Sequence, residues 1–267
     1  MTAKTYGSMD IFKLLPKTNC KECRAPSCLA FSVLAAKGEK ELEECPYLDD
    51  NALARFGGER KKPKSVQENL EASVARLKEK LAAIDFSEAS RRIGGNVSNG
   101  KLSFKIYGKD FAVDKTGVFS SDIHVYPVAV PVLHYILYSR GLPPSGKWAP
   151  LRELPGGKNW QRLFHQRCEK PLKQIADSYT DLFEDMIRLF NGKTVENLFE
   201  SDISLVLHPF PKVPLLICYW KPDEGMASDL NLFFDQNAEE NLKIESLYTV
   251  GTGLVTMLER FAAKHTQ

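Results

Sequence analysis

Residues 13–48 read KLLPKTNCKECRAPSCLAFSVLAAKGEKELEECPYL and contain four of the chain's six cysteines. Two residues separate the first pair, four the second pair and sixteen the third. Four thiolates satisfy either an iron–sulfur cluster or a tetrahedral zinc ion. A segment of about 40 residues rarely folds on an apolar core alone, so we expect the metal centre to organise it. The candidate metal ligands are Cys20, Cys23, Cys28 and Cys45.

The spacing favours iron and sulfur over zinc. Zinc sites usually combine two short Cys-x-x-Cys turns, because each pair grips the same ion, and here only Cys20 and Cys23 have that form. Three ligands in one loop with a distant fourth suit a larger cluster, in which each cysteine binds a different iron. Pro46, directly after Cys45, also matches the Cys-Pro pair of bacterial ferredoxin sequences. Zinc stays the alternative.

The composition of the chain favours a soluble, cytoplasmic protein. Hydrophobic residues make up 43% of 267 residues, and 36 Lys and Arg nearly balance 34 Asp and Glu, so no basic face for nucleic acid is indicated. The first 15 residues lack the apolar core of a signal peptide, and no run approaches the roughly 20 apolar residues of a membrane span. In a reducing compartment, clustered cysteines indicate metal ligation or redox chemistry before disulfides.

Composition also predicts two domains joined by a linker. Residues 1–56 are expected to form the cluster-binding module, and residues 66–267 a larger domain. Between them, residues 57–65 (GGERKKPKS) have the glycine, proline and charge content of a linker. Ser65 and Glu68 then form a capping-box pattern in front of an amphipathic helix.

The larger domain is predicted to mix helices and strands in runs rather than in regular alternation. Short alternating segments on either side of Gly108 predict a hairpin. Branched and aromatic runs predict three strands, ISLVLHPF (203–210), VPLLICYW (213–220) and DLNLFFDQ (229–236). Helical patterns cover residues 128–139, 160–175, 181–190 and 247–263. We therefore expect an α+β fold: a small irregular, helical 4Fe-4S module followed by an α+β domain with an antiparallel or mixed sheet.

The cysteine-rich stretch resembles the N-terminal 4Fe-4S domain found in the large subunit of the corrinoid iron–sulfur protein and in the B subunit of Rnf-type electron-transport complexes. The resemblance covers residues 9–48 and rests on landmarks around the cysteines. They are Leu15-Pro16, Asn19, Pro26, Cys28-Leu29-Ala30, Lys37-Gly38 and Cys45-Pro46. It implies that each of the four cysteines binds one iron of a 4Fe-4S cluster used for low-potential, single-electron transfer. One departure is Arg24, where the family commonly has glycine.

Residues 90–264 resemble a family described only as domain of unknown function 3786, seen mostly in anaerobes. ELPGG, HPFPKVPLLICYW and IESLYTVGTGL carry this resemblance, which implies no particular chemistry. The barrel and the Asp-x-His-x-x-Gly cobalamin signature that accompany the cluster domain in the corrinoid protein are not apparent. We therefore do not expect this chain to be that protein itself.

Two histidines are candidate cofactor-binding residues for a corrinoid or other tetrapyrrole. His134 lies in a nearly all-apolar helix, and His165 lies beside Arg167 on the next helix. The alternative interpretations are a hydrogen-bonded core histidine and a surface histidine, respectively. Cys168 and Cys218 lie in apolar segments and are interpreted as ordinary buried cysteines. No triad, phosphate loop or dinucleotide fingerprint is present, so no catalytic residue is assigned.

Three functions follow from these features. The first is an iron–sulfur electron-transfer protein of anaerobic metabolism, a redox accessory rather than an independent enzyme, which delivers low-potential electrons to a corrinoid or one-carbon-pathway partner protein. The second is a cofactor-binding enzyme whose larger domain holds a tetrapyrrole or other acceptor reduced by the cluster. The third is a non-redox binding or assembly module that the cluster only staples together.

Overall fold

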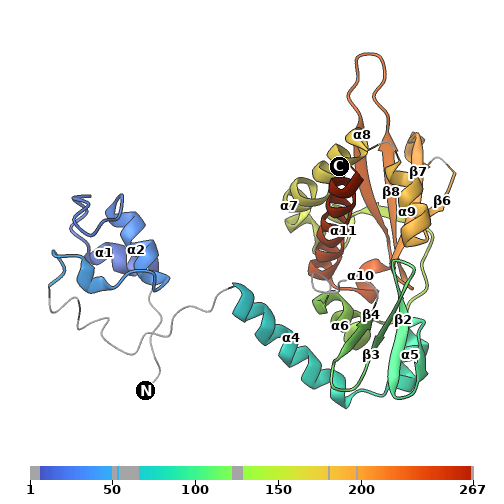
Figure 1. Ribbon diagram of the computed structural model, residues 1–267, viewed down its shortest axis with the longest axis horizontal. Coiled ribbons are helices and arrows are strands. Elements are labelled where there is room, and N and C mark those ends of the chain that lie inside the picture. Colours follow the sequence, from blue (N-terminus) through green and yellow to red (C-terminus); the bar gives the residue numbers. More distant parts are fainter. Residues whose placement is uncertain are drawn as a thin grey trace. The chain divides into compact units, whose positions relative to one another are not determined.

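The computed structural model describes residues 7–49, 53, 66–121, 129–179, 181–196 and 198–265. The chain forms two compact units, residues 1–71 and 72–267 (Figure 1). The expected linker, residues 57–65, and the expected capping residue Ser65 lie outside the described residues. Among the helices that are described, none combines the length and the apolar character needed to cross a bilayer.

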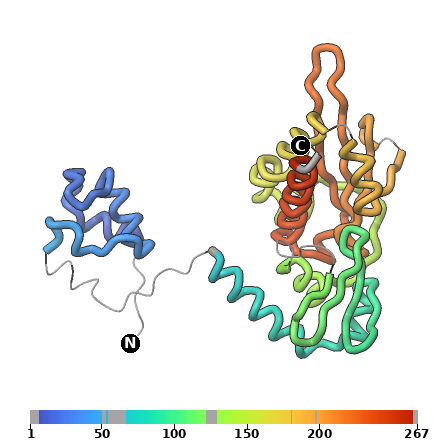
Figure 2. Tube along the Cα trace, viewed as in Figure 1, coloured from blue at the N-terminus to red at the C-terminus, as the bar shows by residue number. Residues whose placement is uncertain are grey.

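The first unit is built from short helices around the cysteine loop, the blue segment in Figure 2. Its elements are α1 (Ser8–Leu14), α2 (Cys28–Ala36) and the 3-10 turn η1 (Leu42–Glu44). Ser27 caps α2, because its hydroxyl accepts a hydrogen bond from Ala30 N at 3.1 Å. Gly38 ends it with φ +72°, a backbone conformation that glycine adopts without strain.

The second unit begins within the helix α4 and continues with a second helix and a small antiparallel sheet. Asp85 caps α5 through Ser87 N at 2.8 Å, and the left-handed Gly94 ends that helix. The sheet has the order β1-β2-β3-β4, with the predicted hairpin at its centre. The elements are α4 (Val66–Ala83), α5 (Phe86–Ile93), β1 (Asn96–Ser98), β2 (Lys101–Ile106), β3 (Lys109–Val113), β4 (Phe119–Ser121) and α6 (Ala129–Tyr138).

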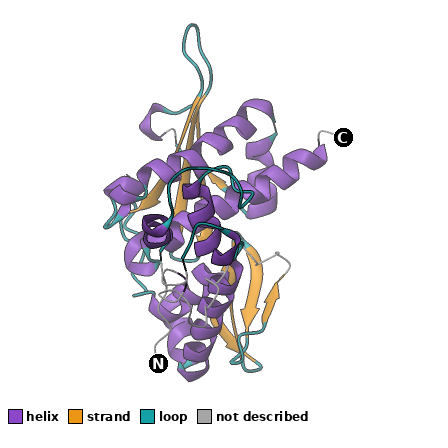
Figure 3. Cartoon of the chain, turned by 90° about the vertical axis from the view of Figure 1, so that its left-hand side faces the viewer, coloured by secondary structure: helices purple, strands orange, loops and turns teal. Residues whose placement is uncertain are grey.

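A five-stranded antiparallel sheet forms the rest of the second unit, in the order β5-β9-β8-β7-β6. Helices pack beside it (Figure 3), which confirms the α+β class. The strands are β5 (Trp148–Pro150), β6 (Lys193–Thr194), β7 (Ile203–Phe210), β8 (Val213–Trp220) and β9 (Asp229–Asp235). The helical segments are η3 (Leu151–Glu153), η4 (Gly157–Asn159), α7 (Gln161–Phe164), η5 (His165–Glu169), α8 (Lys170–Ser178), α9 (Leu182–Phe190), η6 (Leu198–Glu200), α10 (Ala238–Asn241) and α11 (Ile244–His265).

The central strand β8 is apolar on both faces. Leu215 and Ile217 join the main core shared with the helices, whereas Leu216 and Cys218 belong to a smaller apolar cluster. That cluster also includes partly buried aromatic residues such as Trp148 and Trp220. Two-sided burial explains why β7 and β8 read as nearly continuous apolar runs rather than as alternating ones.

The predicted helix over residues 160–175 is present as one continuous helical run from Gln161 to Ser178, but the prediction missed a π-helical turn inside it. The run consists of α7, the π-helical turn η5 and α8, and Leu163 in its first turn is 40% exposed. The N–H of Lys170 bonds to the carbonyl of His165, five residues back. Pro171 explains the wider turn, because it has no N–H to donate and its ring cannot fit an α-helical turn.

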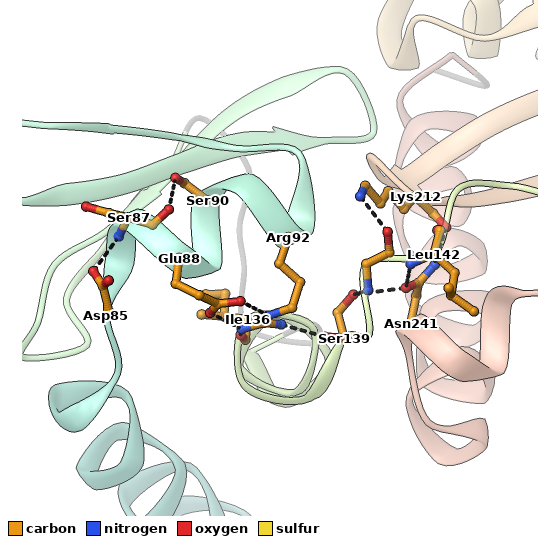
Figure 4. A network of polar contacts seen from close by, with 11 residues as sticks. Asp85, Ser87, Glu88, Ser90, Arg92, Ile136, Ser139, Leu142, Lys212 and Asn241 are labelled. Carbon is orange, nitrogen blue, oxygen red and sulfur yellow. Dashed lines mark hydrogen bonds and ion pairs between the residues drawn. The ribbon is translucent and has the colours of Figure 1, made fainter.

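A buried polar network joins the helices of the second unit to the large sheet (Figure 4). Arg92 donates to the carbonyls of Ile136 at 3.1 Å and Ser139 at 2.6 Å, and so satisfies the C-terminal end of α6. Asn241, 1% exposed, uses its whole amide. Its oxygen accepts from Ser139 Oγ and Leu142 N, and its nitrogen donates to the carbonyls of Leu142 and Lys212.

We expect Asn241→Ala to lower the free energy of unfolding of the second unit by about 3 kcal/mol, because it leaves several buried groups without partners. The chain's tryptophans, Trp148, Trp160 and Trp220, all lie in this unit, so urea denaturation followed by tryptophan fluorescence reports on it directly. The control is Asn159→Ala, since Asn159 is exposed, and it should change stability by less than about 0.5 kcal/mol. Equal losses in both variants would contradict the role of the network.

Candidate iron–sulfur site

Three of the four clustered cysteines are part of the core of the first unit. Cys23, Cys28 and Cys45 are each less than a tenth exposed, whereas Cys20 is exposed. The apolar side chains around them come from α1, α2, η1 and the loop between the two helices. They are Ile11, Leu15, Ala25, Phe31, Ala35 and Leu42. Thiols therefore supply a third of the buried side chains in this small core.

The loop that carries the first two cysteines has an unusual backbone. Lys17, Asn19, Lys21 and Arg24 have φ of 58°, 50°, 65° and 59°, and none of them is glycine. Left-handed residues alternating with others turn successive N–H groups toward one side of the chain, and such concave backbone "nests" bind anions and iron–sulfur clusters. The conformation is strained for these residue types and persists only where the surroundings hold it.

Asn19 links this loop to the third cysteine. Its Oδ1 accepts a hydrogen bond from the N–H of Cys28 at 2.8 Å. Cys28 is the first residue of α2, where unpaired N–H groups and the helix dipole favour negative charge. Cys20 directly follows Asn19. The side chain of Asn19 thus fixes the start of α2 relative to Cys20.

The fourth cysteine is tied to the same loop by Tyr47. The hydroxyl of Tyr47 donates to Glu22 Oε1 at 2.8 Å, which connects the turn after Cys45 to the turn between Cys20 and Cys23. Burial raises the pKa of the Cys45 thiol, and the nearby thiols act in the same direction. The N–H of Tyr47 bonds to that sulfur and opposes the rise. Ionisation of the Cys45 thiol therefore needs a compensating positive charge, which a bound iron would supply.

The donor set fits an iron–sulfur cluster on chemical grounds. Three thiols share one small core and the fourth is exposed on the same loop, four residues of that loop have the positive φ typical of a nest, and the N–H of Tyr47 favours the ionised form of Cys45. Within the described residues, no group of three or more His, Cys, Asp or Glu side chains, the four cysteines included, is already arranged to hold a metal ion. Cys20, Cys23, Cys28 and Cys45 are the thiols available for iron.

The two candidate histidines of the second unit lie in different surroundings. His134 Nδ1 is 2.7 Å from Ser246 Oγ, and its ring packs against Tyr138. Burial, and then the charge of Lys243, lower its pKa. A half-buried histidine bonded to a serine matches the core interpretation.

His165 is on the surface, in the π-helical turn, with 59% of its side chain exposed. Its Nδ1 is 3.0 Å from Glu169 Oε2, and the other oxygen of Glu169 accepts from Leu232 N at 3.2 Å. Both side chains line a cavity of about 390 Å³. Cys168 and Cys218 are fully buried, and burial raises the pKa of both thiols, as expected of structural cysteines.

A family model described as domain of unknown function DUF3786 matches residues 85–257, more than half of the chain. The chain belongs to this family. A second model, described as "Putative Fe-S cluster", matches residues 15–47. The DUF3786 region thus lies within the second unit, and the cysteine loop lies in the region that carries the iron–sulfur match.

Two curated relatives are similar to the N-terminal region of this DUF3786 protein. The acetyl-CoA decarbonylase/synthase complex subunit gamma of Methanocaldococcus jannaschii is 50% identical over 46 residues, which are 17% of this chain and 9% of that protein. The corrinoid/iron–sulfur protein large subunit of Moorella thermoacetica is 50% identical over 44 residues, 16% of this chain and 10% of that protein. The chain thus matches about a tenth of the length of these relatives. No solved structure matches it.

These similarities support an iron–sulfur cofactor in the first unit. The sequence predicted the four thiols but missed the residues that position them. Tyr47 and Glu22 are 25 residues apart, and no sequence motif predicts the hydrogen bond between them. Asn19 was noticed only as a family landmark, although an asparagine shortly before a helix is a recognisable signal for such a bond.

We expect Arg24→Gly to retain the metal cofactor longer than Arg24→Ala. Both variants lose the guanidinium group, but only glycine adopts φ near 59° without strain, a difference of about 1 kcal/mol. The measurement is the bleaching rate of the cofactor's visible absorbance in the presence of an iron chelator, and glycine should slow it several-fold. Equal rates would mean that the left-handed backbone at this position is not needed for retention.

Proposed function

We propose that the protein is a cytoplasmic iron–sulfur electron-transfer protein of anaerobic metabolism, which delivers low-potential electrons to a corrinoid-dependent or one-carbon-pathway partner protein. The observation that carries this proposal is the packing of three cysteine thiols into one small core, with the fourth, Cys20, exposed on the same loop. The relatives that share this segment are named as a corrinoid/iron–sulfur protein and an acetyl-CoA decarbonylase/synthase subunit. A shared module of this size supports a shared redox role, and the reactions of the whole relatives are not implied.

A bound 4Fe-4S cluster would supply one electron at a time at low potential. Cys20, Cys23, Cys28 and Cys45 would ligate its four irons. The N–H of Tyr47, which favours the ionised form of the Cys45 thiol, would also stabilise added negative charge there and so favour the reduced state.

Cys20 is the exposed ligand and marks the side from which a partner reaches the cluster. Lys17, Lys21 and Arg24 are exposed on the same loop, so we propose that the partner presents an acidic surface.

Anaerobic purification with iron and sulfide analysis tests the cofactor. We expect about four irons and about four sulfides per chain, and a rhombic electron paramagnetic resonance signal after reduction. One zinc without sulfide would refute the proposal. A complete cluster that cannot be reduced would instead favour the non-redox assembly module.

We expect Cys→Ser at any of the four ligand positions to abolish or strongly deplete the 4Fe-4S cluster, because serine is a poor ligand for these irons. The matched control is Cys218→Ser, whose sulfur already lies near the hydroxyls of Ser201 and Ser204. It should keep its iron. If the Cys218→Ser control lost its iron while the four ligand variants kept theirs, the assignment of the four cysteines as ligands would be overturned.

The cofactor-binding alternative is supported by one observation at His165. A carboxylate on Nδ1 leaves Nε2 as the ligating atom, which is the arrangement typical of metal-bound histidines. We therefore propose His165 before His134 as the ligand to a tetrapyrrole or other acceptor, if the second unit binds one.

For this alternative, we expect protein purified under strict anaerobiosis to show a second chromophore besides the cluster. His165→Ala should remove that chromophore and His134→Ala should not, because His134 is already bonded within the core. Absorption spectra of the two variants decide the matter. A preparation with no chromophore beyond the cluster would count against the cofactor-binding alternative and leave the electron-transfer role untouched.

A further inference from the structure

A basic groove of about 690 Å³ opens in the second unit, where the β2–β3 hairpin, the end of α9 and strand β7 meet. This volume is within the range of small-molecule sites. Five of its lining residues carry a basic group: Lys105, Lys109, Arg188, Lys193 and His208. Among the described lining residues, Asp110 is the only acidic one.

The groove is built from irregular backbone that is held in place. Strand β7 shifts register between Leu207 and Phe210, and within this irregularity the carbonyl of His208 accepts a hydrogen bond from Tyr107 N at 3.0 Å. Such bulges re-aim side chains and often lie next to functional sites. Gly108 packs directly on the end of α9, since a Cβ there would lie 2.6 Å from that of Asn191. The walls are thus fixed by main-chain contacts.

The positive charge in the groove is only partly neutralised by the protein. Lys105 pairs with Asp110 at 2.7 Å, and Arg188 pairs with Asp185. Within the part of the chain that the structure describes, Lys109 and Lys193 have no carboxylate partner. Burial, and then the charge of Lys193, lower the pKa of His208. The ammonium groups of Lys109 and Lys193 therefore line the same groove without a carboxylate to neutralise them.

The groove also has apolar lining. Leu189 and Pro211 are partly exposed there, whereas Phe104 and Phe190, each 5% exposed, are covered almost completely by the core behind them. A ligand that fits has an anionic end and an apolar body. A phosphate monoester carries a charge of about −1.5 to −2 at neutral pH, which matches two unpaired ammonium groups better than a single carboxylate does.

We propose that this groove binds a small organic phosphate, with Lys109 and Lys193 holding the phosphate group and Leu189 and Pro211 contacting the apolar part. The site is in the DUF3786 region and does not depend on the cluster or on the electron-transfer role. It gives the second unit a ligand of its own.

Phenyl phosphate is a suitable probe, because it combines a dianion with one apolar ring. We expect its titration into the full chain to cause saturable amide chemical-shift changes at Gly108, Asn191 and Lys193. Phenol, benzoate and inorganic phosphate should each bind more weakly. Lys109→Gln and Lys193→Gln should each weaken phenyl phosphate binding about tenfold, as expected for loss of a charge-assisted hydrogen bond.

Lys101→Gln is the matched control, since Lys101 is an exposed lysine on β2 that does not line the groove, and it should leave binding unchanged. Three outcomes would overturn the proposal. They are no chemical-shift changes at the groove, Lys109 and Lys193 variants that bind phenyl phosphate as tightly as the unmodified chain, or benzoate binding as tightly as phenyl phosphate. Unchanged tryptophan fluorescence confirms that the variants are folded.

Discussion

One main-chain hydrogen bond, from Tyr107 N to the carbonyl of His208, joins the two sheets of the second unit. It is possible only because β7 is irregular at His208, and because Tyr107 and Gly108 adopt positive φ in the hairpin turn. Tyr107 is then buried, and its hydroxyl reaches the carbonyl of Val250 in α11 at 3.2 Å. One turn thus sets the small sheet, the large sheet and the long helix against each other. The basic groove lies at this junction.

The first unit obeys a different constraint. Its core is too small to hold the chain by apolar burial, and thiols occupy a third of its buried positions. Side chains outside that core, Asn19 and Tyr47, connect the segments that carry the cysteines. The two units are therefore stabilised differently. Burial of apolar surface stabilises the second unit, whereas the first depends on hydrogen bonds that connect its cysteine-bearing segments.

The sequence predicted the regular elements because their signals are local. The runs at 203–210 and 213–220 match β7 and β8, and DLNLFFDQ extends only one residue beyond β9. The π-helical turn was missed because the effect of Pro171 depends on the turn before it. The groove was missed because Lys109, Lys193 and His208 meet only through the junction of the two sheets. At Arg24, the departure from the glycine of the resembled cluster domain was the hint of a left-handed residue.

The loop from Lys17 to Arg24 also has a consequence for how a loaded protein is recognised. Four non-glycine residues held at positive φ form a shape that the bare chain does not favour. Gaining or losing the metal would therefore change the outline of the backbone around the exposed Cys20, as well as its charge. A partner that contacts this loop would distinguish the metal-loaded protein from the metal-free protein by the shape of the loop. It would therefore not form a complex with the metal-free protein.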